Sequence, residues 1–148
     1  MKSLLLSSLF VTFALCMGCL QTTPQKTEIA IAALPKDHPI RQRYYATLVF
    51  GCDNIHVREA AIAHVNDEAL LASIAETHPD WILREAATRK LSNASILFTV
   101  AQNDAHSMVR IAAIEQLEDP VLLATIATTN DHWPARKAAV QKLSDRNL

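Results

Sequence analysis

The sequence predicts an all-α fold built from short two-helix repeats with a period of 26 residues. Three observations support this prediction: an Arg-x-Ala-Ala motif recurs in register, the apolar residues around each copy have helical spacing, and an Asp or Asn follows each copy at a fixed distance. Because such hairpins can bury their apolar stripes only against neighbouring hairpins, we expect them to stack as an α-solenoid. The motif arginines are Arg58, Arg84, Arg110 and Arg136.

Each motif copy is predicted to lie on the first helix of a repeat. An aliphatic residue, the second alanine of the motif and a later aliphatic residue occupy positions i, i+4 and i+8, which form one face of a helix. Val57, Ala61 and Val65 show this spacing in the first copy. The repeats are therefore expected over residues 57–148, with first helices that start near residues 57, 83, 109 and 135.

A second helix is predicted to start shortly after each first helix. Two residues past the last aliphatic residue, every copy has an Asp or Asn, both of which are preferred helix N-caps. Pro120 follows in the third copy, at the first helical position that proline favours. The predicted N-caps are Asp67, Asn93, Asp119 and Asp145.

Residues 28–56 are predicted to form an atypical N-terminal capping repeat. Pro39 and Arg41 have the same spacing as Pro134 and Arg136, but tyrosines replace the alanine pair. Only 17 residues separate Arg41 from the next motif arginine, so this copy is expected to lack a normal second helix. Terminal repeats of a stack often deviate from the consensus in this way.

The first 18 residues have the pattern of an export signal. Lys2 supplies a positive start, and an apolar run from Leu4 to Leu15 follows. A membrane-spanning helix needs about 20 apolar residues, so this run is too short to be a permanent anchor of that kind. We therefore expect export with cleavage, and an uncleaved apolar anchor is an alternative.

The end of this signal resembles the lipobox of bacterial lipoproteins, since Gly18 directly precedes Cys19. The resemblance implies cleavage after residues 1–18, lipidation at Cys19 and membrane attachment through that lipid, with residues 19–27 as the lipidated cysteine and a short tether. Leu20 in place of an aspartate implies the outer membrane, with the domain facing the periplasm. A secreted or soluble periplasmic protein is the alternative.

The charge balance argues against nucleic acid as a partner. The chain has 14 basic and 15 acidic residues, a formal net charge of −1, and no basic stripe. Export and lipidation would leave Cys52 as the one remaining thiol of the mature chain, so no intramolecular disulfide is expected. We expect Cys52 to be a buried small residue, and an intermolecular disulfide is the alternative.

The repeats resemble the HEAT-type and leucine-rich-variant α-solenoid families over roughly residues 28–148. The resemblance rests on the arginine-bearing first helix, the Asp-capped Leu-Leu-x-x-Ile-Ala second helix and the short period. It implies a curved, right-handed stack that serves as a scaffold for protein partners. A few members of these families are enzymes or bind nucleic acid.

The motif arginines are interpreted as a structural ladder. A row that recurs with the repeat and faces the predicted N-cap row is expected to form hydrogen bonds and ion pairs between repeats, which can fix the stacking angle. An anion-binding row is the alternative interpretation.

No catalytic residue, metal ligand or cofactor site is predicted. The histidines lack an HExxH pattern and an i, i+4 pair, and the chain has no CxxC, so they are interpreted as surface turn residues: His38, His56, His64, His78, His106 and His132. Gly18 and Gly51 are the only glycines, which excludes glycine-rich phosphate loops and a G-x-S-x-G nucleophile elbow.

The sequence favours a protein or peptide as the partner. Trp81 and Trp133 stand just before first helices, where they either cover turns or, with Phe98, form an interface. Exposed positions of the second helices are small and nearly uncharged, which also suits a peptide. We therefore expect a non-catalytic, membrane-tethered interaction or scaffold module of the envelope. A solenoid enzyme or enzyme accessory is the alternative, and a polar pocket containing His106 or His132 would favour it.

Overall fold

The structure is a computed structural model that describes residues 31–145. The predicted signal peptide, Cys19 with the tether, the first residues of the predicted cap and residues 146–148 lie outside this range. Within it, all regular secondary structure is helical, in eight α-helices, which confirms the all-α prediction. None of these helices is long and apolar enough to cross a membrane. The helices belong to two compact units divided after Asp67.

Unit 1 contains the helices α3 (Pro39–Gly51) and α4 (Ile55–Ile62), which pack against each other. Tyr45 and Val49 form the buried face of α3. The buried Gln42 side chain joins α3 to the segment after α4, because its Oε1 accepts hydrogen bonds from the backbone N–H groups of Asn66 (2.7 Å) and Asp67 (3.2 Å).

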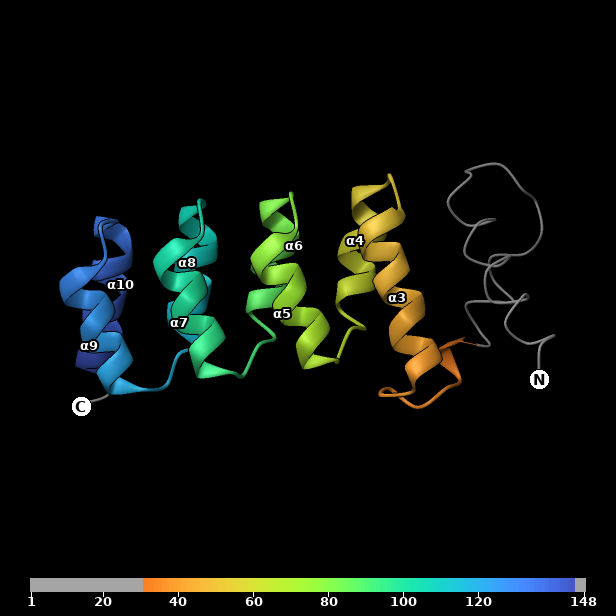
Figure 1. The fold of residues 1–148 in the computed structure, drawn as a ribbon, viewed down its shortest axis with the longest axis horizontal. Coiled ribbons are helices and arrows are strands. Elements are labelled where there is room, and N and C mark those ends of the chain that lie inside the picture. Colours follow the sequence, from red (N-terminus) through yellow and green to blue (C-terminus); the bar gives the residue numbers. More distant parts are fainter. Residues whose placement is uncertain (1–30, 146–148) are drawn as a thin grey trace. The chain divides into compact units, whose positions relative to one another are not determined.

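Unit 2 contains three helical hairpins that lie side by side (Figure 1). Helices α6, α8 and α10 pack in order in one layer, and α5, α7 and α9 pack in order in the other. The hairpins are α5 (Glu68–Thr77) with α6 (Trp81–Thr88), α7 (Ala94–Asn103) with α8 (Ser107–Gln116), and α9 (Pro120–Thr129) with α10 (Trp133–Asp145).

The pairing of helices differs from the prediction. The repeat pattern predicts that each arginine helix pairs with the helix after it, but α6, α8 and α10 each pair with the helix before them. Unit 1 follows the same scheme, since α3 precedes and pairs with the arginine helix α4. As expected for the leading copy, no second helix lies between α3, which carries Arg41, and α4. Arg41 nevertheless does not belong to the arginine row, because α3 takes the place of the helix that precedes each arginine helix. Its Nη1 donates instead to the backbone oxygens of Ala32 and Leu34.

The arginine helices start two residues earlier than predicted. The reason is local capping: the side chains of Asn54, Asp80 and His106 each accept a hydrogen bond from the backbone N–H two residues further on. Histidine is not among the usual N-cap residues, so the sequence did not indicate the start of α8 at His106, whereas Asn54 and Asp80 are of the types that commonly cap helices. Trp81 and Trp133 consequently lie at the first position of a helix rather than before it.

The predicted caps of the second helices are partly confirmed. Asn93 and Asp119 cap α7 and α9, and each accepts hydrogen bonds from two backbone N–H groups. Asp145 instead is the last residue of α10, and its predicted capping role concerns residues outside the described range.

The core of unit 2 follows the predicted helical faces. Ala87, Ala113 and Ala139 are fully buried where α6, α8 and α10 approach one another. Leu97, Leu123 and other aliphatic residues of the second helices cover the opposite side of the core. Small residues in the arginine layer let these helix backbones come close together.

The turns of unit 2 contain no glycine. Each helix cap described from Asp80 to Asn130 has a φ between −102° and −60°, which any residue can adopt. Side chains hold the turns instead. The C-caps Asp104 and Asn130 accept hydrogen bonds from the backbone N–H groups of His106 and His132.

Candidate functional site

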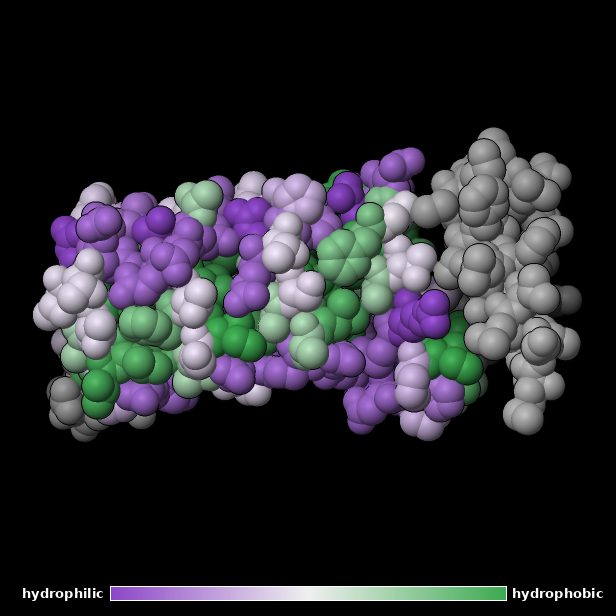
Figure 2. Space-filling view, viewed as in Figure 1, coloured by the Kyte–Doolittle hydropathy of each residue, from purple (hydrophilic) through white to green (hydrophobic). Residues whose placement is uncertain are grey.

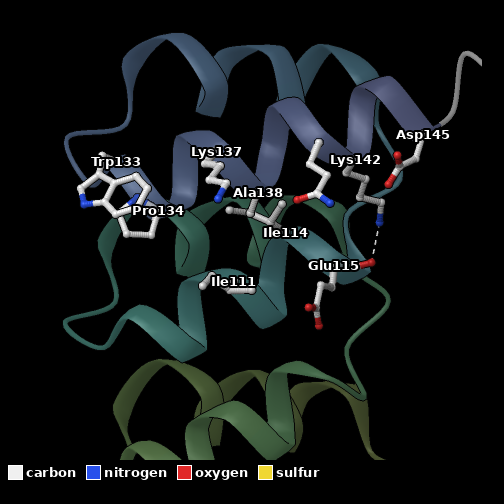
Figure 3. Close-up of a pocket in the computed structure, with 10 residues that line it drawn as sticks. Ile111, Ile114, Glu115, Trp133, Pro134, Lys137, Ala138, Lys142 and Asp145 are labelled. Atoms are coloured by element: carbon white, nitrogen blue, oxygen red, sulfur yellow. Dashed lines mark hydrogen bonds between the residues drawn. The ribbon is translucent and has the colours of Figure 1, made fainter.

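A groove of about 590 Å³ lies between α8 and α10 (Figure 3). Ile111 and the deeply buried Ile114 contribute its apolar base from α8. Pro134 and Ala138 line the α10 side, and Trp133 lies at one end of the groove. The groove is thus an apolar strip on the arginine-helix layer, bordered by polar residues.

Two lysines of α10 line the groove, together with the carboxylates of Glu115 and Asp145. Lys142 lies toward the end opposite Trp133 and donates to the backbone oxygen of Glu115 and to the Glu118 carboxylate (3.0 Å). Lys137 is exposed and points from α10 into the groove, with no hydrogen-bond or ion-pair partner among residues 31–145. A ligand carboxylate could therefore pair with Lys137 without displacing an existing contact.

The groove between α8 and α10 differs in charge from the corresponding contact between α6 and α8. Between α6 and α8, the guanidinium of Arg89 bonds Glu85 (2.9 Å) on its own helix and Glu115 (2.7 Å) on the next. The bond to Glu115, together with the one to Glu85, raises the pKa of Arg89. The corresponding positions between α8 and α10 hold Glu115 and Gln141, which cannot form such an ion pair.

The two tryptophans have different surroundings. Trp81 stacks on His106, the N-cap of α8, and so covers the start of that helix. Trp133 holds the corresponding position on α10 and is 63% exposed, against 36% for Trp81. The expectation that tryptophan covers a turn fits Trp81, whereas Trp133 is available to a partner.

The second-helix layer, which the sequence favoured for peptide binding, has a smaller hollow of about 180 Å³ between α5 and α7. Its lining includes Thr99 and Val100, but not the half-buried Phe98. The larger groove on the opposite layer was missed by sequence reasoning. Neither of these two hollows is lined by His106 or His132.

Arg84 connects two hairpins. Its Nε and Nη2 donate to the two carboxylate oxygens of Asp104 at 2.8 and 3.0 Å, and its Nη1 donates to the backbone oxygens of His78 and Pro79. Asp104 raises the pKa of Arg84 mainly through these hydrogen bonds. Both side chains are largely buried, at 13% and 5% exposure. The row of predicted N-caps was expected to face the arginines, but its member Asn93 caps its own helix, α7.

The other arginines also contact second-helix ends rather than N-caps. Arg110 donates to the backbone oxygen of Asp104 and lies 3.5 Å from Oδ1 of Asn130. Arg136 donates from Nη1 to the backbone oxygens of Asn130 (2.7 Å) and Asp131 (3.1 Å). Arg84 and Arg110 therefore do link successive hairpins, but through second-helix ends and not through the predicted N-caps, whereas Arg136 contacts only its own hairpin.

Arg58 is described within unit 1. Its Nε is buried and has no hydrogen-bond partner among the described residues. Asp67, predicted to face the arginine row, donates its backbone N–H to Gln42.

His38, His78 and His106 each accept a hydrogen bond from the backbone N–H two residues further on, and the histidines do not all lie on the surface. His78 is buried, and its Nδ1 accepts a hydrogen bond from the Asp80 backbone N–H. The Nδ1 atom of His106 accepts one from Met108, but that of His132 is buried without a partner. Pro134 explains this difference, because it occupies the position of Met108 and has no N–H to donate. Among the described residues, no three or more His, Cys, Asp or Glu side chains form a group that could hold a metal ion.

Cysteine makes no contribution to the groove in the described range. Cys52 follows the last residue of α3 and carries a free thiol. Its side chain is half-buried, whereas the sequence led us to expect a buried one. Cys19, the predicted lipidation site, lies outside the described residues.

The groove and the arginine contacts described above are formed entirely by residues of this chain. No protein-family model, curated protein or solved structure matches the chain.

Proposed function

We propose that the protein is a non-catalytic interaction module, tethered to the bacterial envelope, whose groove between α8 and α10 binds a peptide segment of another protein. The observation that carries this proposal is the apolar groove itself, with an exposed tryptophan at one end and the unpaired ammonium of Lys137 beside it. Exposed tryptophans next to apolar pockets are typical binding anchors.

The groove favours a peptide with an apolar and an acidic residue. The apolar side chain would cover Trp133, Pro134 and Ile111, and the carboxylate would pair with Lys137. The volume of about 590 Å³ lies in the range of about 300–1,000 Å³ found for ligand sites. The neighbouring Lys142 is held by Glu118, so Lys137 is the cation that can select an acidic residue.

The proposal includes the finer architecture: an α-solenoid of 26-residue repeats, right-handed as in the families it resembles. Recurring contacts support it. Glu68 accepts hydrogen bonds from the backbone N–H groups of Ser92 (2.8 Å) and Asn93 (2.9 Å), 24 and 25 residues further on. Gln42 in unit 1 accepts bonds from residues at the same two separations. Arg84 and Arg110 likewise each reach a residue 20 positions ahead.

The membrane tether is proposed at Cys19 from the lipobox resemblance. Two or more acyl chains contribute about 0.8 kcal/mol for each buried methylene, which is enough for stable anchoring. Labelling with a radioactive fatty acid tests this part of the proposal. Label is expected in the wild-type protein and absent from Cys19→Ser, and label retained by the variant would reject acylation at that cysteine.

Site-specific photo-crosslinking in cells tests the groove. A benzoylphenylalanine placed at Gln141, which lines the groove, is expected to give a protein adduct. The same residue at Thr128, exposed on α9 of the same hairpin, serves as the matched control. Lys137→Glu should abolish the adduct by reversing the charge. Failure to form an adduct at Gln141, or an adduct that persists in Lys137→Glu, would contradict the proposal.

A further inference from the structure

The outer face of α9–α10, the last hairpin of the described residues, exposes a position that the inner hairpins bury. Thr88 on α6 and Ile114 on α8 are at most 1% exposed, whereas Val140, at the corresponding position of α10, is 52% exposed. On α9, Val121 is also largely exposed, and Figure 2 shows apolar surface over this end of unit 2. Solenoid ends that face water normally carry a polar outer face.

Arg136 on this hairpin has the same local anchoring as Arg84. In each case Nη1 donates to the backbone oxygens of the residues six and five positions earlier. Arg84 then uses Nε and Nη2 to bind the carboxylate of Asp104 on the following hairpin. For Arg136, the Nε and Nη2 edge has no partner among residues 31–145. A guanidinium edge of this kind fits a carboxylate through two parallel hydrogen bonds.

From these two observations we infer that the outer face of α9–α10 binds, end-on, a helical hairpin of another protein whose turn carries a carboxylate that pairs with Arg136. The contact between Arg84 and Asp104 is the template for this interface, and Val140 is the apolar residue that the partner covers. The surface is separate from the groove between α8 and α10. The inference rests on the proposed function, because it gives the interaction module a second partner-binding face.

The residues at the template position argue against a second copy of this chain as the occupant. In the four hairpins, this turn position holds Cys52, His78, Asp104 and Asn130. Only Asp104 offers a carboxylate, and Arg84 already binds it. A partner protein with Asp or Glu in the turn therefore complements Arg136 better than this chain does.

Calorimetric titration of the purified, detergent-solubilised protein tests the inference. The probe is a stapled synthetic hairpin with the sequence of residues 94–116, which includes Asp104, and circular dichroism verifies its helicity before use. We expect one probe to bind each protein molecule. Arg136→Ala should weaken binding at least tenfold, and so should Asp104→Asn in the probe. Arg43→Ala, which removes an exposed arginine from α3, is the matched control and should leave binding unchanged.

Three results would overturn the inference: a helical probe that does not bind, equal binding by the Arg136→Ala protein, or self-association of the protein that depends on Arg136 in sedimentation experiments. The last result would identify a second copy as the occupant. The photo-crosslink at Gln141 separates the two proposals. If the Arg136→Ala protein no longer binds the probe but still forms the crosslink, only the end-on face is affected. If the wild-type protein does not bind the probe but still forms the crosslink, the end-on inference fails and the proposed function of the groove is unaffected.

Discussion

Trp81 lies flat against His106, with 3.9 Å between the ring centroids and 13° between the ring planes. The contact joins the first residue of α6 to the N-cap of α8, so it holds two successive hairpins together at one edge. Because the tryptophan covers a capping side chain, the stack shields the start of α8 from water.

Removing this stack should destabilise the protein. Stacked aromatic pairs contribute about 0.5–1.5 kcal/mol beyond the area they bury, so we expect Trp81→Ala to lower the free energy of unfolding by about 1–3 kcal/mol. Urea unfolding followed by circular dichroism measures the loss. Trp133→Ala is the matched control, since Trp133 has no stacking partner in the described chain and should change stability by less than about 0.5 kcal/mol. Equal losses in the two variants would contradict the assigned role of the stack.

Removing only one partner of the ion pair between Arg84 and Asp104 should destabilise the fold strongly. Both groups are largely buried, so Arg84→Ala leaves the Asp104 carboxylate without its partner, and we expect a loss of about 3–5 kcal/mol. Arg136→Ala removes an arginine with no carboxylate partner in the described residues and should cost much less. A double-mutant cycle with Arg84→Met and Asp104→Leu measures the coupling, and purely additive losses would show that the pair does not act as a unit.

Glu68 should make stability depend on pH in the acidic range. The backbone N–H of Ser92 is the main cause that holds the pKa of the Glu68 carboxyl below its ordinary value of 4.5, and the N–H of Asn93 adds to it. A group with a lowered folded-state pKa stabilises the fold fully above its unfolded pKa, and this contribution is lost as the pH falls through the folded pKa.

The free energy of unfolding should therefore fall as the pH drops below about 5, and Glu68→Gln should flatten that part of the curve. Urea unfolding measured at a series of pH values checks this expectation. Glu76→Gln, an exposed substitution on the same helix, is the control. A Glu68→Gln curve as steep as that of the wild type would rule out Glu68 as the source.

Ala113→Leu should overpack the contact between arginine helices. Ala113 is fully buried on α8, and extra methylene groups in a filled core typically cost about 1–3 kcal/mol. Thermal unfolding is the measurement, with Ala124→Leu at an exposed position of α9 as the comparison. Unchanged melting of Ala113→Leu would contradict the close packing at this position.

The sequence was sufficient to predict the helices and their buried faces, but not which helices pair. Periodicity identifies the apolar face of each helix. When two kinds of helix alternate along the chain, however, each arginine helix can form a hairpin with either the helix before it or the helix after it. The choice depends on the turns. After α6 the chain enters a segment with the buried Leu91, whereas the turn before α6 is short and held by His78 and Asp80.

The partners of the arginines could not be read from the repeat motif, because the residues they contact are not conserved from copy to copy within this chain. Asp104 and Asn130 differ from His78 at the same turn position. The feature of the sequence that could have identified Asp104 and Asn130 as partners is their constant separation of 20 residues from Arg84 and Arg110. The groove had a signal too: the Arg89 position is Glu115 one helix later, so the bridging charge pair is lost.

The glycine-free turns of unit 2 have a consequence for the unfolded chain. Side-chain hydrogen bonds at Asp104, Asn130 and the N-caps hold bends that other proteins often make with glycine. A segment without glycine samples fewer backbone conformations when denatured, so it loses less entropy when it folds. Much of the resistance of these small hairpins to melting is thus expected to come from the stiffness of the denatured polypeptide, in addition to the contacts of the native state.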